Sequence, residues 1–287
     1  MSERSLSVAV ARPSVEHLRQ IAREIRRLSI EMTVAAQSGH ASTALSAAEI
    51  MACLYFSELR LNPEDPEDPD RDRFVLSKGH GCPALYAALA LRGLVPMEEL
   101  WTFRRLGSRL QGHPDRVKLP WIEAPTGSLG QGLSVGMGMA LGARLDGRSY
   151  RVYVLLGDGE CQEGQVWEAA MSAAHYRLDN LVAIVDRNGI QQSARTEDLC
   201  ALEPLEAKWE AFGWWTTRVD GHSVPQILEA LDAARHVTGR PQVIVADTRK
   251  GKGVSFMEDR LGWHGKPPAR DQLDQALAEI LAQEESG

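Results

Sequence analysis

The sequence lacks closely spaced cysteines, long hydrophobic runs and an excess of positive charge. Its cysteines, Cys53, Cys82, Cys161 and Cys200, include no C-x-x-C pair, which favours a reduced protein over a disulfide or zinc framework. No apolar run reaches the roughly 18 residues of a membrane span, and MSERSLSVAV is too short and too weakly apolar for a secretory signal. The formal net charge of −7 disfavours nucleic acid as a partner. We therefore expect a cytoplasmic protein with no nucleic-acid or membrane partner.

The composition suits one large domain that alternates strands and helices. Apolar residues make up 44% and charged residues 25% of the 287 positions, as in ordinary globular proteins. Short apolar runs predict strands at 73–77, 151–156, 181–186, 214–220 and 241–248. Helices are expected at 13–37, 45–59, 81–93, 97–106, 126–147, 163–176, 224–237 and 270–287. This order predicts an α/β fold, a parallel sheet with helices on both faces, in a single domain over 1–287.

Two polar loops follow neighbouring predicted strands. Gly157-Asp158-Gly159 comes directly after the strand at 151–156, and Asn188 comes shortly after the strand at 181–186. The carboxyl ends of parallel strands meet at one sheet edge, so a carboxylate and an amide oxygen converge there, a donor set suited to Mg²⁺ or Ca²⁺. The glycines allow close approach of a ligand, and the helix beginning near Glu163 directs its positive end there. A metal-bound diphosphate is favoured, with two plain turns as the alternative.

Four histidines stand beside glycine in predicted loops. They are His40 in SGH, His80 in SKGH, His113 in QGH and His264 in GWHG. Imidazoles at such bends present neutral donors and acceptors to a ligand, which indicates a polar, sugar-like pocket. The remaining four, His17, His175, His222 and His236, are interpreted as structural or surface residues.

These motifs resemble a known family. G-D-G followed about 30 residues later by Asn, after a second buried strand, is similar to the signature of thiamine diphosphate enzymes. The blocks SGHASTALSAAEIM, DRFVLSKGHGCPALYAAL, QGHPD, TGSLGQGLSVGMGMA, GDGECQEGQVWEAA, DNLVAIVDRNGIQ and KGKGVSFMED…WHGKPP resemble transketolase in the same order, across roughly residues 15–270. The sequence departs from that family in GHASTALS, where transketolases usually have G-H-P-G-x-P-L-G.

The resemblance implies thiamine diphosphate as cofactor, with Mg²⁺ or Ca²⁺. The implied metal ligands are Asp158, Asn188 and the carbonyl of Ile190. The implied cofactor contacts are His80, Gly127, Ser128, Leu129, Gly157, Asp158, Gly159, Glu160, Asn188 and His264. The implied catalytic residues of the sugar channel are His40, His113 and His264, and Glu163 is expected in a subunit contact.

The family likeness also implies a partner. Transketolases carry the pyrimidine-binding and C-terminal domains after this region, and we expect both to be absent from this chain. The resemblance then predicts the N-terminal subunit of a split transketolase, active only with a C-terminal subunit in an α₂β₂ assembly. The predicted reaction moves a two-carbon ketol unit from a ketose or its phosphate to an aldose or its phosphate. The sequence does not specify the sugars.

Other functions fit fewer of the motifs. The α-subunit of a 2-oxo acid dehydrogenase E1 component shares G-D-G and Asn but has less use for hydroxyl-binding histidines. Deoxyxylulose-phosphate synthases normally carry all three domains in one chain. A nicotinamide-dependent dehydrogenase is disfavoured because GQGLSVG follows no predicted strand. An inactive protein with the same fold remains the non-enzymatic alternative.

Overall fold

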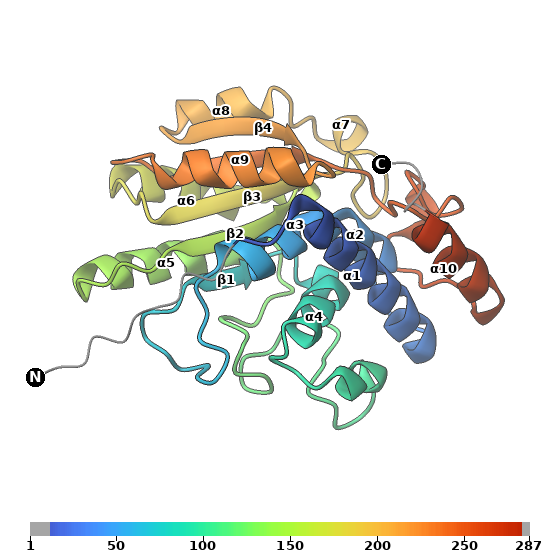
Figure 1. Ribbon diagram of the computed structural model, residues 1–287. Helices are drawn as coiled ribbons and strands as arrows, with labels where there is room; N and C mark the ends of the chain where they lie inside the picture. The colour runs from blue at the N-terminus through green and yellow to red at the C-terminus, as the bar shows by residue number, and fades with distance from the viewer. Residues whose placement is uncertain (1–11, 283–287) are drawn as a thin grey trace, which may run out of the picture.

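A five-stranded parallel sheet forms the centre of the protein, whose computed structural model describes residues 12–282 (Figure 1). The strand order is β1-β2-β3-β5-β4. The strands are β1 (Arg73–Leu76), β2 (Val152–Gly157), β3 (Leu181–Arg187), β4 (Trp215–Asp220) and β5 (Gln242–Asp247). Every neighbouring pair is parallel, so the predicted α/β fold is confirmed.

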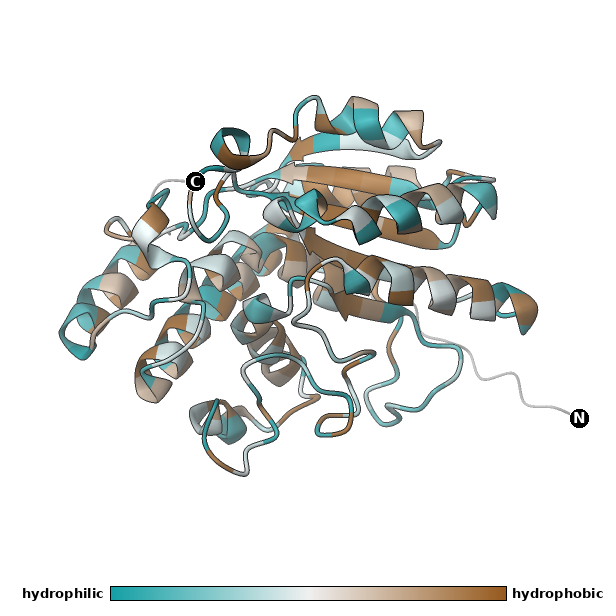
Figure 2. Cartoon of the chain, turned by 180° about the vertical axis from the view of Figure 1, so that it is seen from behind, coloured by the Kyte–Doolittle hydropathy of each residue, from teal (hydrophilic) through white to brown (hydrophobic). Residues whose placement is uncertain are grey.

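Helices cover both faces of the sheet, and the strands are correspondingly apolar (Figure 2). Side chains alternate between the faces: Tyr153 and Leu155 pack in one core cluster, and Val152, Val154 and Leu156 in the other. The first cluster contains residues of α1 (Val15–Ala36), α3 (Ala48–Cys53), α4 (Cys82–Leu91) and α9 (Val224–Arg235). The second contains residues of α5 (Gln131–Leu145), α6 (Gly164–His175) and α8 (Leu205–Ala211). Burial on both faces explains the unbroken apolar runs.

Several predicted helices are shorter or divided. The segment expected as one helix at 45–59 is α2 (Ala41–Ser46), α3 and a π-helical turn (Leu54–Glu58), with Ala47 at φ −94°, ψ 3° between α2 and α3. All of 41–53 is buried, so no periodic pattern marked the break. The helix expected at 126–147 begins at Gln131, because Gly127 and Gly130 have positive φ.

The chain also departs from the prediction near 97–106 and in its last part. The first region forms only a 3₁₀ helix (Met97–Thr102), and Arg104 takes a left-handed φ of 58° as the chain turns. The last helix, α10 (Leu273–Leu281), starts later than expected, and the prediction for 283–287 lies outside the described residues. The short helices α7 (Thr196–Leu199) and α8 were not predicted.

A third apolar cluster joins α10 to α1 and α2. Ile280 and Ala276 of α10 pack with Met257 and Val254, in the loop that follows β5. Glu279 also accepts hydrogen bonds from the backbone N and the Oγ of Ser255, at 2.5 and 2.8 Å. This packing anchors the loop that carries Lys250 and His264. Across residues 12–282, no helix combines the length and hydropathy needed to cross a lipid bilayer.

Candidate active site

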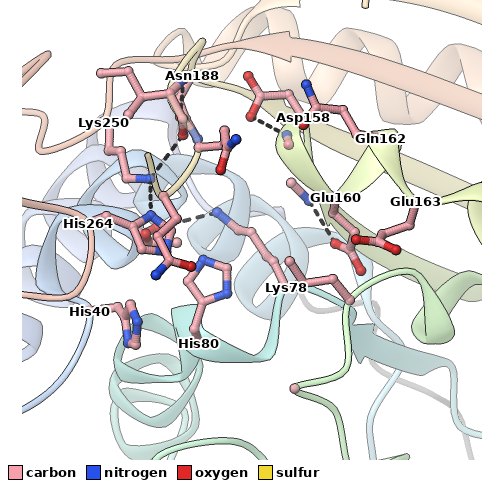
Figure 3. A pocket seen from close by; sticks show the side chains of 18 of the residues that line it. His40, Lys78, His80, Asp158, Glu160, Gln162, Glu163, Asn188, Lys250 and His264 are labelled. Atoms are coloured by element: carbon pink, nitrogen blue, oxygen red, sulfur yellow. Dashed lines mark hydrogen bonds between the residues drawn. The ribbon is translucent and has the colours of Figure 1, made fainter. Parts of the chain in front are cut away.

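A cavity of about 410 Å³ opens at the carboxyl edge of the sheet (Figure 3). Loops that follow β1, β2, β3 and β5 form its walls, together with the loop before α2. In Figure 3, Asp158, Glu160 and Glu163 lie on one side. Lys250, His40, His80 and His264 lie on the other. The cavity therefore lies where parallel α/β sheets commonly bind ligands.

Asp158 and Asn188 meet at this edge as expected. Gly157 pairs with Asp186 in the β2–β3 register, which brings the residues that follow each strand together. Asp158 is 1% exposed, and its Oδ1 accepts the Gly159 N–H at 2.7 Å. Burial, and next the charge of Asp186, raise the pKa of Asp158. A cation beside this carboxylate would oppose that shift.

Asn188 and Ile190 add two more oxygen atoms. The Asn188 Oδ1 accepts the Ile190 N–H at 3.1 Å, and the Ile190 carbonyl accepts from Lys250 Nζ at 3.0 Å. In the described part of the chain, no group of three or more His, Cys, Asp or Glu side chains is placed to hold a metal. A metal here would therefore depend on one carboxylate, one amide and one carbonyl, the oxygen donors that Mg²⁺ and Ca²⁺ prefer.

Glu160 connects the loops that surround the predicted phosphate site. Its Oε1 accepts hydrogen bonds from the Ser77 hydroxyl and from the Gly130 N–H, the latter at 2.9 Å. Its Oε2 accepts from the Gly157 N–H at 3.0 Å. Both oxygens of this buried carboxylate are thus engaged within the protein. Glu160 lines the cavity, and its contacts brace the loops after β1 and β2 and before α5.

Three of the four predicted histidines form a compact cluster. The ring centroids of His40 and His80 are 5.0 Å apart, those of His40 and His264 5.3 Å, and those of His80 and His264 5.0 Å. His113 lines the same cavity, beside Gly127, where a Cβ would lie 3.2 Å from the His113 Cδ2. The structure therefore gathers all four histidines around one cavity.

Partial burial, together with neighbouring positive charges, favours the neutral form of these imidazoles. Burial and the neighbouring Arg104 lower the pKa of His40 to about 4. Burial and Lys250 lower the pKa of His264 to about 3. The pKa values of His80 and His113 are lowered as well, chiefly by burial. A neutral imidazole donates from one nitrogen and accepts at the other, as hydroxyl recognition requires.

Two buried lysines belong to the site, and the sequence patterns did not single them out. Lys78 contacts the carboxylate of Asp186, and Lys250 Nζ lies 2.6 Å from His264 Nδ1. Burial lowers the pKa of Lys250 to about 8. Both residues stand in the quoted SKGH and KGKG blocks, but lysine is rarely buried, so only the fold shows that they face the cavity.

All but one of the remaining predicted site residues line the cavity. Gly127, Leu129, Gly157, Gly159 and Glu163 line the cavity. Ser128 is exposed and lies outside the cavity wall, although both of its neighbours contribute to it. Thr43, Gln162, Gln191 and Gln192 also line the cavity and were not predicted.

The residues present fit a metal-bound diphosphate. The cavity combines oxygen donors for a hard cation with two lysines and neutral histidines that suit phosphate oxygens. The buried Thr43 Oγ1 and His40 Nδ1 lack partners among the described residues and are available to a ligand. Gly159 is tightly enclosed, since a Cβ there would lie 2.7 Å from the Gln191 Cβ. Gly159 also lines the cavity, and its lack of a side chain lets a bound group approach the backbone closely.

Fold and site together define a parallel α/β domain with a polar cavity at the carboxyl edge of its sheet. The chain belongs to the transketolase family: a sequence profile described as "Transketolase, thiamine diphosphate binding domain" matches residues 17–283. The predicted family is thereby confirmed. This assignment supports a transketolase over the alternative of a 2-oxo acid dehydrogenase component.

Relatives of two lengths match the chain. It is 44% identical over 263 residues to the 6-deoxy-6-sulfo-D-fructose transketolase subunit SqwG of Clostridium sp. (strain MSTE9), covering 92% of this chain and 96% of that one. It is 41% identical over 266 residues to an apulose-4-phosphate transketolase subunit of Phocaeicola vulgatus, covering 93% and 94%. With the transketolase of Pongo abelii, identity is 46% over 273 residues, but only 43% of that longer protein is covered.

Solved transketolase structures share the fold. The enzyme from Campylobacter jejuni superposes with a TM-score of 0.88 at 32% sequence identity, covering 95% of this chain and 43% of that one. The transketolase from Leishmania mexicana gives 0.85 at 34% identity, covering 93% and 41%. The chain thus spans less than half the length of these solved enzymes. They confirm that its fold is the thiamine diphosphate-binding fold.

Proposed function

We propose that this chain is the diphosphate-binding subunit of a two-component transketolase in the cytoplasm. The observation that carries the proposal is the convergence of Asp158, Asn188 and the histidine cluster on one cavity. Two relatives of nearly equal length, named as transketolase subunits, support a division of the enzyme between two chains. A separate subunit would supply the pyrimidine-binding and C-terminal domains. This chain would then be a single diphosphate-binding domain, and two copies of each subunit would form an α₂β₂ assembly.

Asp158, Asn188 and the Ile190 carbonyl would hold Mg²⁺ or Ca²⁺ against the diphosphate of thiamine diphosphate. His80, His264, Lys250 and the backbone of Gly159 would contact the diphosphate end. When bound, the cofactor supplies the carbanion chemistry of ketol transfer. The protein supplies binding and orientation on this side of the cofactor.

His40, His113 and His264 would act on the sugar. Because their pKa values are lowered, these imidazoles favour the neutral form, in which one ring nitrogen can accept a hydrogen bond from a substrate hydroxyl near pH 7. We propose a ketose or ketose phosphate as donor and an aldose or aldose phosphate as acceptor. The names of the relatives indicate that sulfonated and phosphorylated sugars are substrates within this group of proteins.

The surface beside the cavity would receive the partner. Glu163 is exposed at the cavity edge and precedes α6. On α5, a Cβ placed on Gly138 or Gly142 would meet no atom within 4 Å, so the helix surface there is open. Val135 and Met171 add exposed apolar area on α5 and α6. We propose that this surface, with Glu163, forms the subunit contact.

The test combines this chain with its partner subunit. The chain alone, given thiamine diphosphate and Mg²⁺, is expected to show no ketol transfer, and the partner is expected to restore it. Full activity of the chain alone would refute the two-component proposal. Asp158→Ala should abolish Mg²⁺-dependent retention of thiamine diphosphate in the assembled protein. Pyruvate and branched 2-oxo acids serve as control donors, and an assembled protein that uses only these would overturn the transketolase assignment.

A further inference from the structure

Arg187 points away from the residues on either side of it. It is the last residue of β3, between Asp186 and Asn188. Successive side chains of a strand face opposite sides of the sheet. Asp186 accordingly contacts Lys78 and the Ser46 hydroxyl on the α2 side. Arg187 extends to the other side, towards α7, where its side chain is 8% exposed.

All three guanidinium nitrogens of Arg187 donate hydrogen bonds. Nη1 donates to Asp158 Oδ2 at 2.9 Å and to Thr196 Oγ1 at 2.7 Å. Nη2 donates to Glu197 Oε1 at 2.8 Å, and Nε to Glu203 Oε1 at 3.3 Å. These partners hold the guanidinium plane in one place. The contact with Asp158 is therefore made by a fixed donor.

Arg187 is also the only side chain in the described residues with a hydrogen bond to the Asp158 carboxylate. The other two donors are the backbone N–H groups of Gly159, at 2.7 Å to Oδ1, and of Gly189, at 2.6 Å to Oδ2. Together, these three hydrogen bonds fix the orientation of the carboxylate plane. Oδ2 accepts two of these hydrogen bonds, whereas Oδ1 accepts one and retains acceptor capacity for a further ligand.

We infer that Arg187 is a positioning residue that orients the Asp158 carboxylate for the divalent metal. The inference rests on the metal site proposed above. Groups that hydrogen-bond a metal ligand fix its direction, and their loss typically weakens metal binding by about 10–100-fold. A guanidinium that instead competed with the metal for the same oxygen would weaken metal binding. The two effects predict opposite changes in metal affinity on removal of Arg187.

The experiment compares Arg187→Met and Arg187→Lys with wild type. The control is Arg218→Met. Arg218 Nη1 and Nη2 also donate to Glu203 Oε1, each at 3.3 Å, and its hydrogen bonds to other residues go to Asp247 and not to Asp158. In the assembled two-subunit protein, one measures the Mg²⁺ concentration that half-saturates thiamine diphosphate retention. Thermal unfolding of each metal-free variant reports on the fold.

Arg187→Met is expected to raise the half-saturating Mg²⁺ concentration by about 10–100-fold. Arg187→Lys keeps the charge but loses the fork of donors, so an intermediate increase is expected. Arg218→Met should match wild type. A half-saturating concentration that is unchanged or lower in Arg187→Met overturns the inference. If Arg187→Met does not fold, Arg187→Lys provides the test, and an unchanged or lower half-saturating Mg²⁺ concentration in that variant overturns the inference.

Asp158→Ala in the same assay separates this inference from the proposed function. If wild-type retention does not need Mg²⁺, or if Asp158→Ala retains the cofactor normally, the metal site and the role of Arg187 are both refuted. If Asp158→Ala loses retention while both Arg187 variants behave as wild type, only the role of Arg187 is refuted.

Discussion

The ammonium of Lys78 contacts the carboxylate of Asp186, and each side chain is at most 1% exposed. Asp186 also accepts hydrogen bonds from the hydroxyls of Ser46 and Thr248. The Lys78 charge is the second influence on the Asp186 pKa after burial, and the net effect is to lower that pKa. This buried pair therefore belongs to the wall of the cavity, which Lys78 lines.

Lys78→Met should strongly destabilise the chain. The substitution leaves the Asp186 carboxylate buried without its cation, and breaking a buried ion pair typically costs about 3–5 kcal/mol. Urea unfolding of the metal-free chain measures the loss. Lys118→Met, at an exposed position, is the control. The double variant Lys78→Met/Asp186→Asn removes both charges and should recover part of the stability. No recovery would show that packing of the lysine stem dominates.

Alanine substitutions at two glycines of α5 should have opposite effects on the free energy of unfolding. At Gly136 a Cβ would lie 2.5 Å from Val154 Cγ2, whereas at Gly138 no atom lies within 4 Å. Gly136→Ala should destabilise the fold by about 1–3 kcal/mol through overpacking. Gly138→Ala should stabilise it by about 0.5–1 kcal/mol, because glycine is unfavourable within a helix. Denaturant unfolding of the two variants tests this, and equal effects would contradict the packing of α5 on β2.

Gly159→Ala should weaken cofactor retention while leaving the fold intact. Its new Cβ would press on Gln191 and displace the loop that carries the Ile190 carbonyl. We expect at least about a tenfold loss of thiamine diphosphate affinity in the assembled protein, equivalent to about 1.4 kcal/mol. Gly164→Ala is the control, because open space surrounds that position. Normal retention by Gly159→Ala would remove this loop from the cofactor site.

The stability contributed by His40 should fall in acid. Unfolded histidine has a pKa of about 6.5, whereas burial holds the folded pKa of His40 at about 4. Between these values the unfolded chain binds a proton that the folded chain does not, so the free energy of unfolding decreases as the pH falls.

A comparison with His40→Gln isolates this effect. Burial raises the pKa values of Asp158 and Glu160, which opposes the histidine effect in the wild type, but both carboxyls are common to the two proteins. Urea unfolding between about pH 7.5 and 4 should show wild type losing stability relative to His40→Gln as the pH falls below about 6.5. A pH-independent difference would contradict a buried neutral His40.

The sheet and the convergence of Asp158 and Asn188 could be predicted because both follow from simple rules. Apolar runs identified each strand, and the rule that parallel strands end at one edge brought Asp158 and Asn188 together. The histidines were found because each stands close to a glycine in a loop. The contact between His40 and His264 required the loop before α2 and the loop after β5 to meet, which no local pattern specifies.

The contributions of charged residues could not be predicted. Lys78 and Lys250 look like surface residues in the sequence, and their burial depends on how loops pack over the sheet. Arg187 is adjacent to the predicted Asn188, but its role depends on strand alternation and on the position of α7, a helix that was not predicted. The break at Ala47 was hidden by uniformly buried surroundings.

The hydrogen bonds of Glu160 have a thermodynamic consequence. Because Ser77, Gly130 and Gly157 already satisfy its carboxylate, the conformational entropy of ordering these loops is lost during folding. Ligand binding then needs little further ordering, and preorganisation of this kind increases affinity. A second chain that completes the site would consequently meet a rigid surface, and its association would resemble docking more than coupled folding.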